Sequence, residues 1–303
     1  MDEPSAPESP AESLSWRYRV EAWLARSGIW LIGRLPLDWA SGLGGFLART
    51  VGPRLGISKR ARLNLRAAMP ELDDGQIEAI VRGMWDNLGR VAFEYPHLSR
   101  ITVYPAELND DRVEVCGVEH VEAALAAKRS IILVSAHLAN WEIAPLASGQ
   151  YGLETAFIFR AANNPLVDVM LGGQREHATF IPKGANAARQ AFATLRRGGH
   201  LGLLVDQKLN DGIAVPFFGR DAMTAPAPAV LGLRFRCDIL PARVERLRGA
   251  RFRLTVEPPV PLPDSGDRDA DTLAVMTAIN QTIERWVREH PEQWLWLHRR
   301  WPD

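Results

Sequence analysis

The pattern of hydrophobic positions changes once along this chain, at Val113. Before that point, apolar residues recur at three- and four-residue intervals, most clearly over residues 77–88, and Pro70 and Asp73 mark the start of that helix. We therefore expect residues 14–100 to be helical.

From Val113 onward, short apolar runs alternate with helical patterns. The runs predict strands at residues 113–115, 131–134, 156–159, 201–205, 239–240 and 252–256. Helical patterns cover residues 118–127, 142–150, 165–177, 186–197 and, after a proline-rich connection, 271–289. This alternation predicts an α/β fold with a largely parallel central sheet flanked by helices and a helical N-terminal region.

One domain is expected over residues 14–303, because no internal repeat or long break divides the chain. The first thirteen residues, MDEPSAPESPAES, are acidic and rich in proline. They do not have the composition of a secretory signal, and we expect a disordered tail there.

The apolar stretch over residues 28–48 is the best candidate for a membrane span. A spanning helix needs about 18 or more nearly uncharged residues, whereas Arg34, Pro36 and Asp38 interrupt this stretch. We therefore expect peripheral attachment through residues 14–100 rather than a span.

Four tryptophans and a basic run favour such attachment. The run from Arg49 to Arg66 holds six basic and no acidic residues, and anionic headgroups attract such residues. The tryptophans are Trp16, Trp23, Trp30 and Trp39. The alternative is that the tryptophans belong to the core of a helical layer and that the run is a solvated helix face.

Composition excludes several classes of protein. Basic and acidic residues number 36 each, so no excess of positive charge indicates a nucleic-acid partner. Cys116 and Cys237 are too few for a disulfide framework, which is typical of a reducing compartment, and we expect both in the core.

The most suggestive polar residues follow the run at 131–134. His137 comes directly after this predicted strand, and Glu142 comes five positions later. If His137 lies in the turn before a helix, Glu142 can hold one imidazole nitrogen while the other takes a proton, which is a general-base dyad. Alternatively, His137 caps the helix and Glu142 faces water.

Two further strand ends carry polar residues. Asp206 and Gln207 follow the run at 201–205, where they could orient polar substrate groups or simply end the strand. Arg160, Asn164 and Arg175 follow the run at 156–159, and arginine forks suit phosphate oxygens.

Other chemistries lack their motifs. The sequence has no G-x-S-x-G elbow, no phosphate-binding G-x-x-x-x-G-K-[ST] loop and no H-E-x-x-H pair. His177, His200, His290 and His298 have no metal-ligand spacing, so we predict neither a metal nor a cofactor.

The segment from His137 to Glu142 resembles the H-x-x-x-x-[DE] signature of glycerolipid-type acyltransferases, and more narrowly that of the lipid A biosynthesis (lauroyl/myristoyl) acyltransferase family. The resemblance covers roughly residues 15–301. Its further blocks are Arg62–Pro70, Asn87–Arg90 with Glu94, Phe159–Arg160 with Asn163–Pro165, Asp206–Gln207, Phe217–Gly219 and Thr224.

The resemblance implies an enzyme on the cytoplasmic face of the bacterial inner membrane. It would move an acyl chain from an acyl-carrier-protein thioester to a hydroxyl of a lipid A precursor. His137 would be the general base and Glu142 its partner, and Arg160, Asn164, Arg175, Asp206 and Gln207 would bind substrate. With a base that activates the hydroxyl directly, no covalent intermediate is needed.

Three alternatives to this function remain open at this point. The acceptor could be another polar lipid, such as a phosphatidylinositol mannoside. The protein could instead be a thioesterase-like hydrolase in which His137 activates water, or a lipid-binding protein without catalysis. The basic run at 49–66 could serve an acidic carrier protein as well as lipid headgroups.

Overall fold

A computed structural model describes residues 16–105, 111–159, 164, 178–184 and 186–301. In these ranges, seven strands form one sheet in the order β1-β9-β8-β2-β5-β3-β4. The strands are β1 (Val113–Cys116), β2 (Ile131–Ser135), β3 (Thr155–Phe159), β4 (Thr179–Pro182), β5 (His200–Leu204), β8 (Asp238–Arg248) and β9 (Arg251–Val256).

Neighbouring strands run parallel except for the β8-β9 hairpin, which is antiparallel. The predicted α/β fold with a largely parallel centre is confirmed, and each of the six predicted apolar runs overlaps a strand. The sequence pattern missed β4 and a separate hairpin of β6 (Ile213–Phe217) and β7 (Arg220–Thr224). These strands are short or polar, and Pro182 and Pro216 weaken their strand signal.

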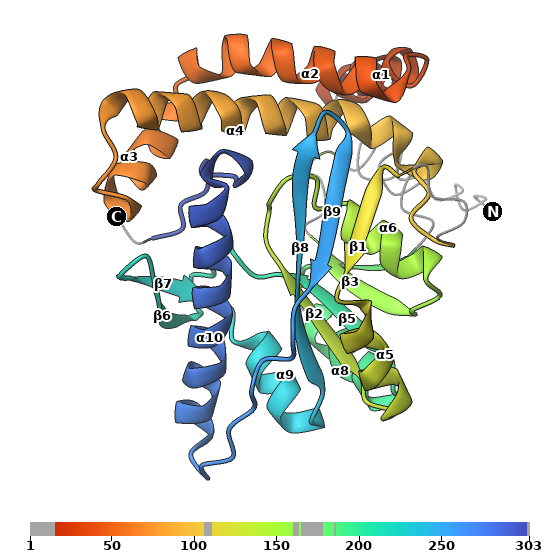
Figure 1. The fold of residues 1–303 in the computed structure, drawn as a ribbon, viewed down its shortest axis with the longest axis vertical. Coiled ribbons are helices and arrows are strands. Elements are labelled where there is room, and N and C mark those ends of the chain that lie inside the picture. Colours follow the sequence, from red (N-terminus) through yellow and green to blue (C-terminus); the bar gives the residue numbers. More distant parts are fainter. Residues whose placement is uncertain (1–15, 106–110, 160–163, 165–177, 185, 302–303) are drawn as a thin grey trace, which may run out of the picture.

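Helices pack on both faces of the sheet (Figure 1). They include α5 (Val118–Ala126), α6 (Ile143–Gln150), α8 (Ala187–Arg196), α9 (Ala227–Phe235) and α10 (Arg268–Glu289). The fully buried β2 separates two parts of the core: Ile132 and Val134 join the cluster that includes α10, and Ile131 and Leu133 join the cluster beside α5. This alternation is the period-two geometry of a strand covered on both faces.

The predicted helical N-terminal region is confirmed over the described residues. It holds α1 (Trp16–Ile32), α2 (Leu37–Val51), α3 (Ser58–Ala68) and α4 (Asp74–Glu94), with short 3₁₀ turns at Gly52–Arg54 and Tyr95–Arg100. Asp73 caps α4 in a capping box with Gln76. The predicted helix at residues 165–177 and the predicted tail at 1–13 lie outside the described residues.

Glycines allow α2 and α4 to lie in close contact. A Cβ added to Gly44 would lie 2.4 Å from the carbonyl oxygen of Gly89, and a Cβ added to Gly89 would lie 2.2 Å from that of Gly44. Any side chain at either position would therefore push the two helices apart. This packing fixes α2 on the outer side of α4, in a helical layer across one end of the sheet (Figure 1).

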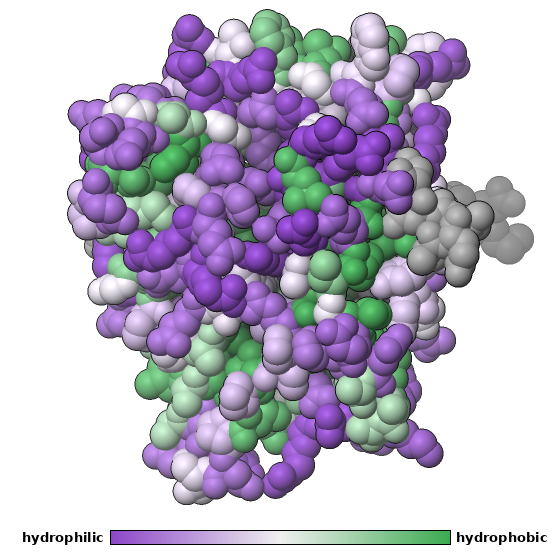
Figure 2. Space-filling view, viewed as in Figure 1, coloured by the Kyte–Doolittle hydropathy of each residue, from purple (hydrophilic) through white to green (hydrophobic). Residues whose placement is uncertain are grey.

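The outer helices expose large apolar side chains. Trp16, Trp23, Trp30 and Trp39 are between 59% and 76% exposed, so the alternative that they form a buried core is wrong. Leu43, Phe46 and Leu47 of α2 are also exposed, and Figure 2 shows apolar groups along the top edge over this layer. Within the described part of the chain, no helix has both the length and the hydropathy of a membrane span.

The basic run at 49–66 meets acidic residues of α4 in space. Arg49 lies 3.0 Å from Asp86, Arg66 lies 2.8 Å from Asp74, and Arg62 forms an ion pair with Glu78. The run is free of acidic residues only in sequence, because the basic residues of α2 and α3 lie against acidic residues of α4. Its net positive field is therefore weaker than the sequence suggests.

The prediction that both cysteines are buried is correct for one of them. Cys237 is buried, but Cys116 is exposed. Cys116 ends β1, which among the described strands pairs with β9 alone and forms the edge of the sheet, so the edge position accounts for its exposure.

Candidate active site

Two neighbouring strands bring His137 and Asp206 together. β2 and β5 pair in parallel with Ser135 opposite Leu204, and the backbone N–H of Val205 donates to the carbonyl of Ser135 at 3.0 Å. Both strands therefore end at the same edge of the sheet. His137 and Asp206 each follow the last residue of their strand by two positions, where ligands gather in open α/β sheets.

The carboxylate of Asp206 holds His137 through two contacts. Its Oδ1 lies 2.8 Å from ring Nδ1, and its Oδ2 accepts the backbone N–H of His137 at 2.9 Å. The indole N–H of Trp294 donates to the same Oδ2 at 2.8 Å. The Asp206 side chain has no exposed surface, whereas that of His137 keeps 15%, so the imidazole alone of this pair can meet a substrate.

Asp206 stays ionised in this buried place. Burial raises its pKa, but the charge of His137 and the hydrogen bonds from its ring and backbone outweigh burial and hold the pKa well below its usual range. An ionised carboxylate at Nδ1 fixes the ring orientation and stabilises the imidazolium that forms when Nε2 takes a proton.

Gln207 occupies the other side of the ring. Its Nε2 lies 3.1 Å from Nε2 of His137 and 2.9 Å from Nε2 of His298. An amide N–H needs an acceptor, so this arrangement leaves the lone pair on Nε2 of His137 and the proton on Nδ1. That is the tautomer a general base requires. The rings of Trp141 and His298 pack edge-on against His137, with centroids 5.1 and 5.3 Å away.

The C-terminal segment supports the turn that carries His137. Leu138 forms a bridge with Trp294, and the N–H of Leu295 donates to the carbonyl of His137 at 3.2 Å. The N–H of Ala139 donates to the carbonyl of Gln293 at 3.0 Å. These backbone contacts tie residues 137–139 to residues 293–295.

Sequence reasoning assigned the imidazole partner to Glu142, but the structure places Asp206 at Nδ1 and Gln207 at Nε2. Glu142 is the N-cap residue of α6, and its backbone N–H donates to Oδ1 of Asn140 at 3.2 Å. The side chain of Asp206, predicted to bind substrate, is fully buried and contacts His137 and Trp294.

Of the other predicted substrate-binding residues, Gln207 lies beside the His137 ring, and the remaining three lie elsewhere or outside the described residues. Asn164 is buried, and its side-chain amide donates to Oε2 of Glu21 and to the carbonyl of Tyr18, both at 3.0 Å, so it holds α1. Arg160 and Arg175 lie outside the residues that the structure describes.

Trp294 and His298 are site residues that sequence reasoning missed. Both lie in the C-terminal segment, far in sequence from His137. A signal was present, because Trp294, Trp296 and Trp301 lie within eight positions of one another. Nothing in the sequence shows which buried group those tryptophans meet.

Fold and site together define an α/β protein with a histidine, held by a buried aspartate, at the carboxyl edge of its sheet. A sequence model of the family described as bacterial lipid A biosynthesis acyltransferase matches residues 9–303, and the chain belongs to this family. It is therefore an acyltransferase, and the predicted family is confirmed.

Two lipid A relatives match more than nine tenths of the chain, and a third relative matches 63% of it. A lipid A biosynthesis lauroyltransferase of Escherichia coli is 25% identical over 288 residues, which cover 92% of this chain and 90% of the relative. A lipid A biosynthesis acyltransferase of Haemophilus influenzae is 25% identical over 301 residues, covering 93% and 89%. A phosphatidylinositol mannoside acyltransferase of Mycobacterium tuberculosis is 26% identical over 197 residues, covering 63% and 60%.

Proposed function

We propose that this protein transfers a fatty acyl chain from an acyl-carrier-protein thioester to a hydroxyl of a lipid A precursor, with His137 as the general base. The observation that carries the proposal is the position of His137 between Asp206 and Gln207, with Nδ1 2.8 Å from the carboxylate. The family and its lipid A relatives favour this acceptor, and the carrier-protein donor is the one that the sequence resemblance implies.

The reaction needs one base and no covalent intermediate. Nε2 of His137 takes the proton of the acceptor hydroxyl while the hydroxyl oxygen attacks the thioester carbonyl carbon. The C–S bond of the tetrahedral intermediate then breaks, and the departing thiolate takes the proton from the imidazolium. A positioned base of this kind contributes about 10²- to 10⁴-fold.

Before the hydroxyl can donate to Nε2, the amide of Gln207 must give up that contact. Gln207 also contacts His298, so it can keep one partner while the acceptor takes its place on His137. In this proposal, Gln207 and His298 orient the acceptor hydroxyl beside the base.

The oxyanion of the tetrahedral intermediate needs hydrogen-bond donors. Two sets are candidates: backbone N–H groups at the start of α6, close to His137 in sequence, and the side chain of Arg175. The carboxylate of Glu142, at the N-terminus of α6, cannot donate to an oxyanion. Its proposed role is the one that the family resemblance implies, in support of His137, and Arg160 is proposed to bind substrate.

The exposed face of α1 and α2 suits peripheral attachment to the cytoplasmic face of the inner membrane. Tryptophan and leucine side chains insert at the boundary between headgroups and acyl chains. An acceptor lipid anchored in the membrane would then reach the enzyme without leaving the bilayer. The basic run at 49–66 lies on neighbouring elements and could contact anionic headgroups or the acidic carrier protein.

Mass spectrometry of the products tests the proposal. Purified protein is incubated with an under-acylated lipid A precursor and an isotope-labelled acyl-carrier-protein thioester, with the same acyl group on coenzyme A as a parallel donor. We expect a mass gain of one acyl chain on the acceptor and a preference for the carrier-protein donor.

Other products would change the assignment. Release of free fatty acid without transfer would indicate a hydrolase. Transfer only to a phosphatidylinositol mannoside would indicate the polar-lipid alternative. A thioester left unconsumed would contradict the proposed donor and favour a lipid-binding protein.

A further inference from the structure

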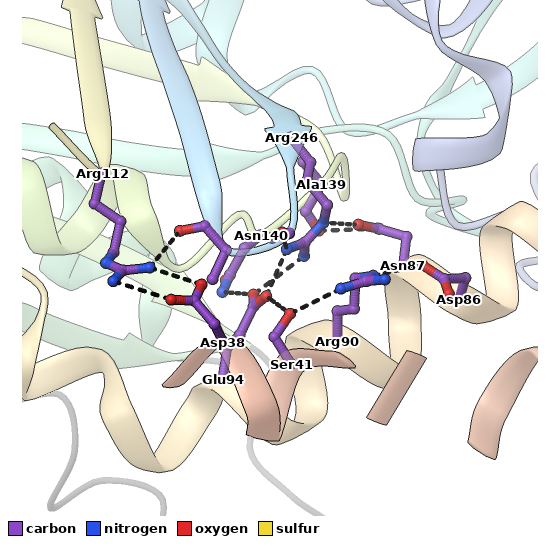
Figure 3. Close-up of polar contacts among 12 residues, drawn as sticks. Asp38, Ser41, Asp86, Asn87, Arg90, Glu94, Arg112, Ala139, Asn140 and Arg246 are labelled. Atoms are coloured by element: carbon purple, nitrogen blue, oxygen red, sulfur yellow. Dashed lines mark hydrogen bonds and ion pairs between the residues drawn. The ribbon is translucent and has the colours of Figure 1, made fainter. Parts of the chain in front are cut away.

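The carboxylate of Glu94 is fully buried where α4 ends, between three elements (Figure 3). The guanidinium of Arg246, on β8, forms an ion pair with it and donates from Nη2 to Oε2 at 3.1 Å. Ser41 of α2 donates to Oε1 at 2.6 Å, and Nδ2 of Asn140 donates to Oε2 at 2.8 Å. Ser41 and Asn140 have no exposed surface.

A buried ion pair of this kind is a weak source of stability, because desolvation of both charges offsets their attraction. Its partners, however, are held firmly, since any displacement leaves a charge without compensation in a low dielectric. Glu94 and Arg246 therefore act as a rigid anchor for the polar groups that contact them.

Asn140 joins this anchor to the active site. It lies three residues after His137 in the same turn. While its Nδ2 donates to Glu94, its Oδ1 accepts the backbone N–H of Glu142 at 3.2 Å. One side-chain amide thus ties the anchor to the start of α6 and closes the turn that begins at His137.

Asn87 is a second link between the anchor and the same turn. Its Oδ1 accepts from Nε of Arg246 at 2.9 Å, and its Nδ2 donates to the carbonyl of Ala139 at 3.1 Å. Ala139 has a φ of +45°, in the left-handed region. A residue with a Cβ persists there only where its surroundings hold it, and the contact with Asn87 is part of that restraint.

We propose that Glu94, held by Arg246, is a positioning residue for the acyl-transfer reaction, and that it sets the position of the His137 ring through Asn140 and Asn87. The pair touches no reacting atom. It acts on the backbone of the turn at Ala139 and Glu142, whereas Asp206 holds the ring nitrogen and the backbone N–H of His137 itself. The kinetic side of this proposal rests on the proposed function.

Asn140→Ala is the most direct test, because it cuts the link between anchor and turn without leaving a buried charge unpaired. The matched control is Gln150→Ala at the far end of α6. It also removes a side-chain amide that forms hydrogen bonds with the backbone: Oε1 accepts from the N–H of Val103, and Nε2 donates to the carbonyl of Ile101 at 2.9 Å. Glu94→Gln is the second variant, and it tests the anchor itself if the turn keeps its conformation in Asn140→Ala. Folding of each is checked by circular dichroism and thermal unfolding.

We expect Asn140→Ala to lower kcat 10- to 100-fold and to leave KM for the thioester within threefold of wild type, because the base is misplaced while the donor site is intact. In histidine-selective ¹⁵N NMR, the His137 ring nitrogens, assigned by comparison with His137→Gln, should shift. Gln150→Ala should lose similar thermal stability but keep kcat within threefold and leave the His137 ring unmoved.

Folded Asn140→Ala and Glu94→Gln with wild-type kcat would overturn the proposal. So would a fall in kcat without movement of the His137 ring, or an equal fall in Gln150→Ala. The NMR measurement needs no substrate. If the ring moves as expected but the wild-type protein transfers no acyl chain, the proposed function fails and the positioning role is supported.

Discussion

The carboxylate of Asp206 holds both the ring and the backbone of His137: one oxygen lies 2.8 Å from Nδ1, and the other accepts the backbone N–H at 2.9 Å. The two residues are 69 positions apart in sequence. Their meeting depends on the parallel pairing of β2 with β5, so the sheet itself assembles the base.

Asp206→Asn should lower kcat roughly 10²- to 10⁴-fold, the range expected for general-base catalysis. The amide cannot stabilise the imidazolium as a carboxylate does. Steady-state kinetics with the thioester donor measure this effect. Glu142→Gln, measured in parallel, compares the contributions of the two carboxylates to kcat. A folded Asp206→Asn variant with wild-type kcat would remove Asp206 from the mechanism.

The same substitution should change stability in a pH-dependent way. The folded pKa of Asp206 lies below its ordinary value of 3.8, so its ionisation stabilises the fold above about pH 4, and this contribution is lost as the pH falls through the folded pKa. The melting temperature of Asp206→Asn should lie below that of wild type at pH 7, and the gap should shrink below pH 4. A gap that widens on acidification would contradict this assignment.

Trp294→Phe should weaken the site by removing one donor from a buried carboxylate. Hydrogen bonds to charged groups contribute about 1.5–3 kcal/mol, and we expect lower thermal stability together with a fall in kcat of about tenfold.

Trp296→Phe is the matched control for that variant. Trp296 is also fully buried and donates from its indole nitrogen, but to the carbonyl of Pro291 at 2.7 Å. It should lose comparable stability and keep kcat within threefold. An equal fall in kcat for both variants would show that Trp294 acts through general packing.

Trp23→Ala combined with Trp39→Ala should weaken binding to phosphatidylglycerol-containing vesicles by at least tenfold, because each side chain offers a largely exposed apolar surface. Vesicle co-sedimentation measures the effect. Leu273→Ala is the control, since Leu273 is exposed on α10 near the end remote from α1 and α2 (Figure 1). Unchanged binding of the double variant would contradict attachment through this face.

The two cysteines should differ in reactivity. Cys116 is exposed, whereas burial, with a smaller effect of Asp238, raises the pKa of Cys237 to about 12. Iodoacetamide at pH 7.5 should therefore add one label, on Cys116, as read by intact mass and peptide mapping. Labelling of both thiols at similar rates would contradict the burial of Cys237.

Local sequence patterns were sufficient to predict most of the fold. The apolar runs and helical repeats carry their own periodicity, and Asp73 marks the start of α4 by its capping chemistry. Strand β4 and the β6-β7 hairpin escaped because their residues are polar or interrupted by proline. The exposure of Trp23 or Trp39 was not predictable either, because periodicity does not show which face of a helix is covered.

The site was predictable only in part. His137 is marked by its place after a buried strand, but its partner is set by which strands are neighbours. Glu142 is close in sequence and Asp206 is close in space, so reasoning from spacing chose the former. Trp294 reaches Asp206 from the other end of the chain, and no local pattern reports such a contact.

Turnover by His137→Ala tests the central claim most directly. The variant is compared with wild type under single-turnover conditions, with a labelled acyl-carrier-protein thioester and the lipid A precursor, after both proteins are shown to be folded. The account predicts acyl transfer by wild type and a loss of at least 100-fold in the variant, with no acyl adduct on either protein. Transfer at the wild-type rate by folded His137→Ala would contradict it.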